Sequence, residues 1–184
     1  MTTDAHVVSP LFFPGGNIGS LSVHGTLNDL AMMGATPVAL TAAFILEEGL
    51  SLQHLDTIVA AMAAACRKAN VTIVAGDTKV VERGKGDGIF ITTTGLGRRL
   101  PGVHCSGSNA KPGDVVIISG TLGDHAVTLM AERHGLTFSK PLQSDSCSLY
   151  PLIEPLLIEN PSAIHVLRDP TRGGVGTTLN EIAH

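Results

Sequence analysis

The 184-residue sequence contains no tryptophan, one tyrosine and five phenylalanines, so aromatic side chains make up only 3% of it. A core must therefore be built from aliphatic residues and methionine, which favours helices packed on a sheet over an aromatic-rich β-sandwich. Twelve basic residues against sixteen acidic ones leave no general attraction to nucleic acid or to an anionic membrane. Any polyanion that binds is expected to be small and held by a few placed charges.

Several common catalytic and targeting motifs are also missing. Cys66, Cys105 and Cys147 form no C-x-x-C, which argues against a disulfide framework or a zinc site. The histidines form neither H-x-x-x-H nor H-E-x-x-H, and the P-loop pattern G-x-x-x-x-G-K-[ST] is absent. Because no signal peptide and no bilayer-length apolar run is found, the sequence predicts a soluble protein of the reducing cytoplasm.

The apolar spacing of the first hundred residues predicts the order β-α-β-α-β-β. The predicted strands are 2–8, 38–46, 71–75 resumed at 80–81, and 89–96, and the predicted helices are 18–34 and 52–66, the second with Ser51 as N-cap. In this interpretation Gly76-Asp77-Thr78-Lys79 interrupts a strand, and Phe12 to Gly16 form a loop. Two helices on one face of a mixed sheet is the economical α+β arrangement.

Residues 101–112 are predicted to link this domain, residues 1–100, to a second domain over residues 113–184. That part predicts strands at 114–119 and 164–167 and helices at 124–134, 149–158 and from residue 174 onward. The helical pattern continues to the last residue, so we expect an α/β domain that is not finished.

Asp4, Asp29 and Asp77 each sit at the boundary of a predicted element. Carboxylates that converge on one sheet edge from different elements are suitable ligands for Mg²⁺, which usually takes one or two of them plus phosphate oxygens. Each aspartate could equally be a turn former, a cap or a solvated charge.

Two glycine-containing runs offer phosphate-binding chemistry. Gly76-Asp77-Thr78-Lys79 combines backbone N–H groups, a hydroxyl, a carboxylate and an ammonium, although a tight turn explains its glycine equally well. In Asp169-Pro170-Thr171-Arg172-Gly173-Gly174, an arginine and two glycines coincide with a predicted helix start, which is either an anion site or an ordinary cap. Of Glu47 and Glu48, which follow a buried strand, at most one is expected to face such a site.

Taken together, the sequence resembles the HypE family of hydrogenase maturation proteins, within the PurM-like superfamily of aminoimidazole ribonucleotide synthetase, selenophosphate synthetase and thiamine-phosphate kinase. Six runs, ordered over essentially the whole chain, carry the resemblance: residues 12–16, 28–31, 45–49, 76–81, 119–125 and 168–174. The resemblance implies a dimer with ATP sites near the interface. It also implies ATP-dependent dehydration of a carboxamide on the sulfur of a C-terminal cysteine to a thiocyanate, the source of the cyanide ligands of the [NiFe]-hydrogenase iron.

The resemblance implies the following roles. Asp4, Asp29 and Asp77 would hold Mg²⁺ on the phosphates of ATP, supported by Asn28, Gly76 and Thr78. Lys79 would stabilise the transferring phosphoryl group or the carboxamide oxygen. Arg172, Gly173 and Gly174 would bind phosphate, and Glu47 or Glu48 would act as base or metal partner. The implied partners are a second copy, the carbamoyltransferase HypF and the iron-carrying HypC-HypD complex.

HypE proteins begin with a further glycine-rich segment and end with an acceptor cysteine, so we expect this chain to be an internal fragment that cannot complete the reaction alone. Two alternatives stay open. One is another ATP-using member of the superfamily, such as selenophosphate synthetase. The other is a non-catalytic remnant for nucleotide binding and dimerisation.

Overall fold

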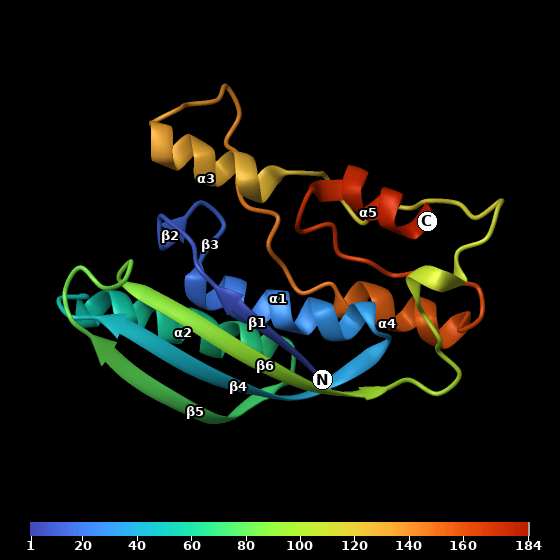
Figure 1. Ribbon diagram of the computed structural model, residues 1–184, viewed down its shortest axis with the longest axis horizontal. Coiled ribbons are helices and arrows are strands. Elements are labelled where there is room, and N and C mark those ends of the chain that lie inside the picture. The colour runs from blue at the N-terminus through green and yellow to red at the C-terminus, as the bar shows by residue number, and fades with distance from the viewer. Residues whose placement is uncertain (184) are drawn as a thin grey trace.

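The structure, a computed structural model, describes residues 1–183. Its N-terminal part is a four-stranded sheet in the order β1-β6-β4-β5. The strands are β1 (Thr2–His6), β4 (Ala35–Glu47), β5 (Thr72–Val81) and β6 (Ile89–Arg99), with β4 and β5 parallel and β6 antiparallel to β1 and β4. Helices α1 (Ile18–Met32) and α2 (Leu52–Lys68) cover one face of the sheet (Figure 1). The predicted α+β class and element order are confirmed.

Helix α1 begins at a capping box. The Asn17 side chain accepts the N–H groups of Gly19 and Ser20, while the Ser20 hydroxyl accepts the N–H of Asn17. Reciprocal bonds of this kind satisfy amides that the first turn leaves without a partner. The helix packs against both the sheet and α2, so it buries the small polar residues Ser22 and Thr26 as well as aliphatic ones.

Helix α2 occupies its predicted position. Ile58, Met62 and Cys66 are buried, whereas Leu52 and Val59 are exposed. The buried residues recur at steps of four, which places them on one side of the helix, and this side packs against α1. Ser51 is the N-cap residue, but its side chain makes no capping bond.

Strand β5 runs without a break through the expected interruption at Gly76 to Lys79, so the tight-turn interpretation is wrong. A side chain at Gly76 would place its Cβ atom 2.5 Å from the carbonyl oxygen of Ala42. The glycine therefore allows β5 to approach β4 closely, and it does not mark a turn.

The second half is built from helices and extended segments. Its elements are the 3₁₀ turn η1 (Gly107–Asn109) and helices α3 (Asp124–His134), α4 (Tyr150–Glu159) and α5 (Gly174–Ala183). The predicted helices are confirmed. Among the described residues, however, the strands expected at 114–119 and 164–167 are not formed, and Val115 and Ile117 are more than 80% exposed. An apolar segment becomes a strand only where another strand satisfies its backbone, and here none lies beside it.

Near the N-terminus, strands β2 (Phe12–Phe13) and β3 (Gly16–Asn17) form a short hairpin in place of the expected loop, and α3 contacts it. Within residues 1–183, every helix is too short or too polar to cross a membrane.

Candidate functional site

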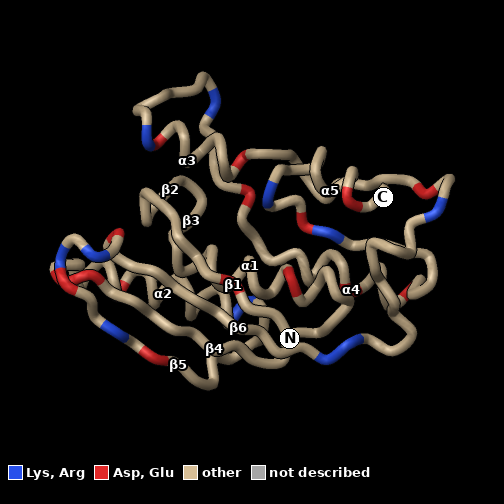
Figure 2. Tube along the Cα trace, viewed as in Figure 1, with Lys and Arg blue, Asp and Glu red and all other residues tan. Residues whose placement is uncertain are grey.

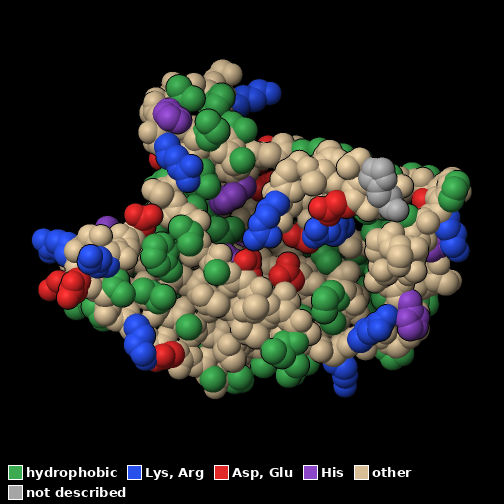
Figure 3. Space-filling view, viewed as in Figure 1, with side chains coloured by type: hydrophobic (Ala, Val, Ile, Leu, Met, Phe, Trp, Pro, Cys, Tyr) green, Lys and Arg blue, Asp and Glu red, His purple; other side chains and the backbone are tan. Residues whose placement is uncertain are grey.

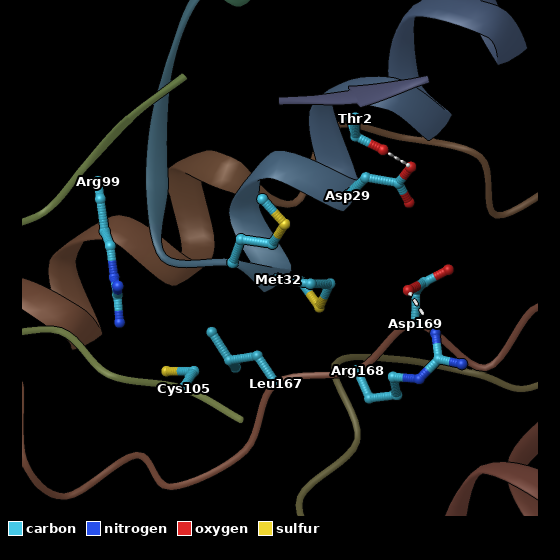
Figure 4. A pocket seen from close by; sticks show the side chains of 9 residues that line it. Thr2, Asp29, Met32, Arg99, Cys105, Leu167, Arg168 and Asp169 are labelled. Carbon is cyan, nitrogen blue, oxygen red and sulfur yellow. Dashed lines mark hydrogen bonds and ion pairs between the residues drawn. The ribbon is translucent and has the colours of Figure 1, made fainter. Parts of the chain in front are cut away.

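A pocket of about 500 Å³ lies where the C-terminal end of α1 meets the segment before α5. Asp29 of α1 and Asp169 of that segment lie on facing sides of the pocket (Figure 4). Figure 3 shows acidic and basic side chains gathered along this boundary between the sheet and α5. Leu167, Met32 and Cys105 line the part of the pocket between these carboxylates and Arg99, which lies on the far side.

Asp29 is the central charge of this site. One of its carboxylate oxygens accepts the hydroxyl of Thr2 at 2.8 Å. Burial raises the pKa of the Asp29 carboxyl, and the nearby carboxylates of Asp169 and Asp4 raise it further, against the opposing effects of the Thr2 bond and of Arg168. Two further carboxylates thus lie close enough to Asp29 to affect its ionisation, and carboxylate oxygens are suitable ligands for a cation.

Asp4 points from β1 toward α1, and its Oδ2 lies 3.5 Å from Nε2 of His6. A Cβ atom at Gly25 of α1 would come within 3.4 Å of the same oxygen. The sheet and α1 thus bring Asp4 and Asp29 into one cluster, as the interpretation of the sequence required of this pair.

Sequence reasoning missed Arg168 and Asp169, which line the pocket, and favoured Arg172, which does not. Arg168 lies 3.3 Å from both Asp169 and Glu181, the latter on α5. Both residues directly precede Pro170 in the run quoted above. Treating Asp169 as a candidate ligand, like the other aspartates at element boundaries, would have identified this part of the site. Gly173 and Gly174 have positive φ at the start of α5, which is a backbone role that glycine fills readily.

Asp77 does not join Asp4 and Asp29 within one chain. Pairing puts Asp4, Thr93, Ala42 and Gly76 in one row across the sheet, so Asp77 lies three strand spacings from Asp4, about 14 Å. The two residues occupy opposite edge strands, β1 and β5. The expectation that three aspartates converge on one edge of this sheet is wrong, because β6 and β4 lie between them.

On that far edge, Asp77 pairs with Lys79. The ammonium group lies 2.7 and 2.6 Å from the two carboxylate oxygens, and the N–H of Thr78 bonds the same carboxylate. These bonds, with that of Lys79 the largest cause, lower the pKa of Asp77. The pair is exposed on β5, where Figure 2 shows adjacent basic and acidic positions.

Glu47 closes the loop between β5 and β6 and does not face the pocket. Its two carboxylate oxygens accept the N–H groups of Gly84 at 2.5 Å and Gly88 at 2.8 Å, and these bonds lower the pKa of Glu47. Asp29 bonds Thr2, whose row across the sheet contains Leu40 of β4. Glu47, the last residue of β4, lies seven residues along the strand from that row, about 23 Å, and Glu48 follows it. In one chain, neither glutamate can act as a base at that pocket.

Removing this carboxylate should release the loop. We expect faster amide hydrogen exchange at Gly84 and Gly88 in Glu47→Ala, and a smaller effect in Glu47→Gln, which keeps an acceptor oxygen. Because the folded pKa is lowered, the wild-type protection is full above the ordinary range of a glutamate and is lost as pH falls through the lowered value. Exchange measured by NMR tests this, with Glu48→Ala as control. Equal exchange in Glu47→Ala and wild type would contradict it.

Asn28 holds the two halves of the chain together. Its side-chain N–H₂ donates to the carbonyl of Cys147 at 2.9 Å, and its side-chain oxygen accepts the N–H of Leu149 at 2.8 Å. One turn earlier on α1, Nδ1 of His24 lies 3.1 Å from the Ser146 hydroxyl. Both ends of the Asn28 amide are therefore occupied by main chain, so its predicted nucleotide contact is not available in this arrangement.

Asn28→Ala is expected to lower the free energy of unfolding by about 1–2 kcal/mol, since a main-chain N–H loses its partner. Proteolytic cleavage within residues 143–149 should become faster. Urea unfolding and limited proteolysis measure the two effects. The control is Thr57→Ala, because that hydroxyl bonds only its own exposed helix, at Gln53. If Asn28→Ala matched this control in both measurements, the proposed role of Asn28 in holding residues 147–149 against α1 would be refuted.

Comparison with known proteins extends the description of the site. Residues 1–99 match the family model described as AIR synthase related protein, N-terminal domain, and residues 111–184 match the corresponding C-terminal domain. The chain belongs to the AIR synthase related family. This member is 60% identical over 183 residues to carbamoyl dehydratase HypE of Azotobacter vinelandii, a match that covers 100% of the chain and 53% of that protein. The chain thus spans about half the length of the curated relatives that it matches.

Solved structures of the family agree with this match. The HypE-HypF complex contains a chain that superimposes with a TM-score of 0.96 at 55% identity, over 99% of this chain and 59% of that one. A HypE in complex with ATP gives the same TM-score at 54% identity, over 99% of this chain and 54% of that one. The resemblance of this AIR synthase related chain to HypE is confirmed.

Proposed function

We propose that this chain forms half of a carbamoyl dehydratase of hydrogenase maturation. In this reaction, ATP drives the loss of oxygen from an S-carboxamide on a C-terminal cysteine, which leaves a thiocyanate. The observation that carries the proposal is that Asp29 and Asp169 face each other across one pocket, with Asp4 near Asp29, in a chain 60% identical to a protein of that name. The solved HypE complex with ATP supports ATP as the nucleotide.

The carboxylate side of the pocket suits the Mg²⁺ that accompanies ATP. Asp29 and Asp4 supply carboxylate oxygens, which Mg²⁺ prefers. The pKa of Asp29 is raised, first by burial and then by the carboxylates of Asp169 and Asp4, whose repulsion a divalent cation would offset. When bound, the ion would neutralise charge on the phosphates. Asp169 faces Asp29 from the second half of the chain, so both halves contribute to the site.

An amide oxygen is a poor leaving group, and transfer of the γ-phosphoryl group makes it a good one. The carboxamide oxygen forms a bond to the γ-phosphorus while the bond to ADP breaks; the carbon–oxygen bond then breaks, phosphate leaves and the nitrogen loses its protons. Catalysis of this kind depends mainly on positioning and charge neutralisation. Lys79 is the proposed cation beside the transferred group, and Arg172 with Gly173 and Gly174 remains the proposed phosphate contact of the second half.

Two copies are required if Asp77 and Lys79 are to reach the pocket. The sheet face turned away from α1 and α2 exposes Ala43, Ile45 and Leu96. A second copy packed on this face in a two-fold arrangement would bring its β5 near β1 of the first. In such a homodimer, each ATP site takes Asp4 and Asp29 from one copy and Gly76, Asp77, Thr78 and Lys79 from the other.

The remaining assignments follow from the same proposal. Residues 1–100 would form the ATP-binding and dimerisation domain, residues 101–112 the linker and residues 113–184 the start of the second domain. A solved complex of HypE with HypF supports HypF as a partner, and HypC-HypD would receive the product. The proposed compartment is the cytoplasm.

A chimera tests the activity, with this chain replacing the matching half of the Azotobacter vinelandii relative. We expect it to convert an S-carboxamide cysteine into a thiocyanate with one ATP consumed per product, measured by mass spectrometry and phosphate release. ATP hydrolysis driven by selenide instead would overturn the proposal in favour of a selenophosphate synthetase. A chimera that binds ATP without either reaction would support the non-catalytic alternative.

A further inference from the structure

The imidazole of His6 lies next to the carboxylate of Asp4, at the floor of the proposed site. His6 is only 7% exposed, and it reaches from β1 into the layer between the sheet and α1. Its Nε2 atom lies 3.2 Å from the hydroxyl oxygen of Thr93 on β6 and 3.5 Å from Oδ2 of Asp4. The metal and nucleotide roles proposed above leave this buried polar side chain without a function.

The contacts of the Thr93 hydroxyl indicate the role of Nε2. This hydroxyl has one hydrogen and three neighbours: the carbonyl of Ser22 in α1 at 3.1 Å, the hydroxyl of Thr26 at 2.5 Å and Nε2 of His6. Because a carbonyl can only accept, all three contacts are hydrogen bonds together only when Thr93 donates to Ser22 and both Thr26 and His6 donate to Thr93.

The second neighbour of Nε2 leads to the same conclusion. An ionised Asp4 carboxylate has no hydrogen and can only accept. Both groups near Nε2 are therefore acceptors, and the nitrogen must carry a hydrogen. The N–H on Nε2 donates to the Thr93 hydroxyl at 3.2 Å. The same nitrogen lies 3.5 Å from Oδ2 of Asp4, so its hydrogen also attracts that carboxylate.

Gly25 of α1 makes room for this arrangement. A Cβ atom there would lie 3.0 Å from Cε1 of His6 and 3.4 Å from Oδ2 of Asp4. The ring is thus held between α1 and β6, with its rotation fixed by Thr93. Because the His6 ring is held in place, its contact with the Asp4 carboxylate limits the orientations of that carboxylate.

We propose that His6 is a positioning residue for Asp4, and that it transmits the rigidity of the Ser22-Thr26-Thr93 network to this carboxylate before Mg²⁺ and ATP arrive. The inference rests on the proposed function for the role of Asp4. Residues that orient metal ligands typically contribute about 10- to 100-fold to metal affinity. His6 would act through Asp4, without contact with the nucleotide.

The hydrogen assignment is testable on the chain itself. Long-range ¹H–¹⁵N correlation spectra of ¹⁵N-histidine-labelled protein distinguish a ring that carries hydrogen on Nε2 from one that carries it only on Nδ1. We expect His6 to show hydrogen on Nε2, with its signals identified by their loss in His6→Gln. A ring with bare Nε2 would overturn the inference, whatever the protein binds.

Binding of Mg-ATP to the same chain tests the positioning role. His6→Phe keeps a ring and loses the donor, and we expect about 10-fold weaker binding by calorimetry. In glutamine the side-chain nitrogen stands the same number of bonds from Cα as Nε2, so His6→Gln should restore most of the affinity. His6→Asn is the matched control, since its shorter amide cannot reach Thr93.

The two variants also separate positioning from simple packing. Equal losses of affinity in His6→Phe and His6→Gln, in step with equal losses of thermal stability, would overturn the positioning role. If neither the wild-type chain nor the chimera bound Mg-ATP, the proposed function would fail, and with it the role of Asp4 on which the inference rests. The ring spectrum would then still decide whether His6 donates to Thr93.

Discussion

Asp29→Asn is expected to abolish dehydration in the chimera without making this chain less stable. The substitution removes a proposed metal ligand, and even residues that only orient such ligands contribute 10- to 100-fold to affinity, so Mg-ATP binding should fall by about 100-fold or more. The asparagine oxygen can still accept the Thr2 hydroxyl. Calorimetry with Mg-ATP and urea unfolding of the same preparations measure the two effects.

The stability effect has a definite sign. Because the folded pKa of Asp29 is raised, chiefly by burial, its ionisation costs stability as pH rises from the ordinary aspartate range through the raised value. At neutral pH, Asp29→Asn should therefore unfold at the same or a higher urea concentration than wild type, and this difference should vanish in acid. Asp56→Asn, an exposed aspartate on α2, serves as the control. A variant that lost both binding and stability would indicate that Asp29 is structural.

Mixing two inactive variants is expected to restore activity, because Asp29 and Asp77 would serve one site from different copies. In a mixed dimer of Asp29→Asn and Asp77→Asn, one site carries both substitutions and the other carries neither. With random exchange between two-fold symmetric dimers, half of the dimers are mixed, so about a quarter of the wild-type activity should return. Each variant alone should be inactive.

The control for this experiment is a mixture of Asp29→Asn with the double variant Asp29→Asn, Asp77→Asn, which contains no intact site in any dimer. Light scattering on each preparation shows whether dimers form. Should the first mixture stay as inactive as its components while mixed dimers are present, Asp77 would not reach the partner's pocket. The 14 Å separation of Asp77 from Asp4 would then leave β5 outside the site altogether.

The N-terminal half was more predictable than the site. Apolar periodicity identified α1, α2 and the main strands because each buries one side against a single layer. It misjudged β5, since a glycine that allows close approach to Ala42 looks, in sequence, like a glycine that turns the chain. It also gave strands to apolar segments at 114–119 and 164–167, because periodicity does not reveal whether another strand lies alongside.

For the candidate residues, the sequence indicated which side chains form polar contacts better than it indicated which of them lie at the pocket. Asp4 and Asp29 do meet, but Asn28 is occupied by main chain at residues 147 and 149, and Glu47 closes a loop. Amide and carboxylate groups bind phosphates, metals and backbone equally well, so residue type alone could not assign these roles. Arg168 was missed because residue type does not distinguish it from Arg172, and Asp169 was quoted in the same run but given no role as a ligand.

The sequence by itself determined the aliphatic core, the α+β class and the family resemblance, because these depend on composition, periodicity and the order of motifs along the chain. Only the tertiary structure decided which carboxylates share a pocket. That outcome depends on strand order: β6 lies beside β1 and brings Thr93 against His6, while β4 and β6 separate Asp77 from Asp4. Strand order is set by contacts between residues far apart in sequence, and local spacing carries no information about them.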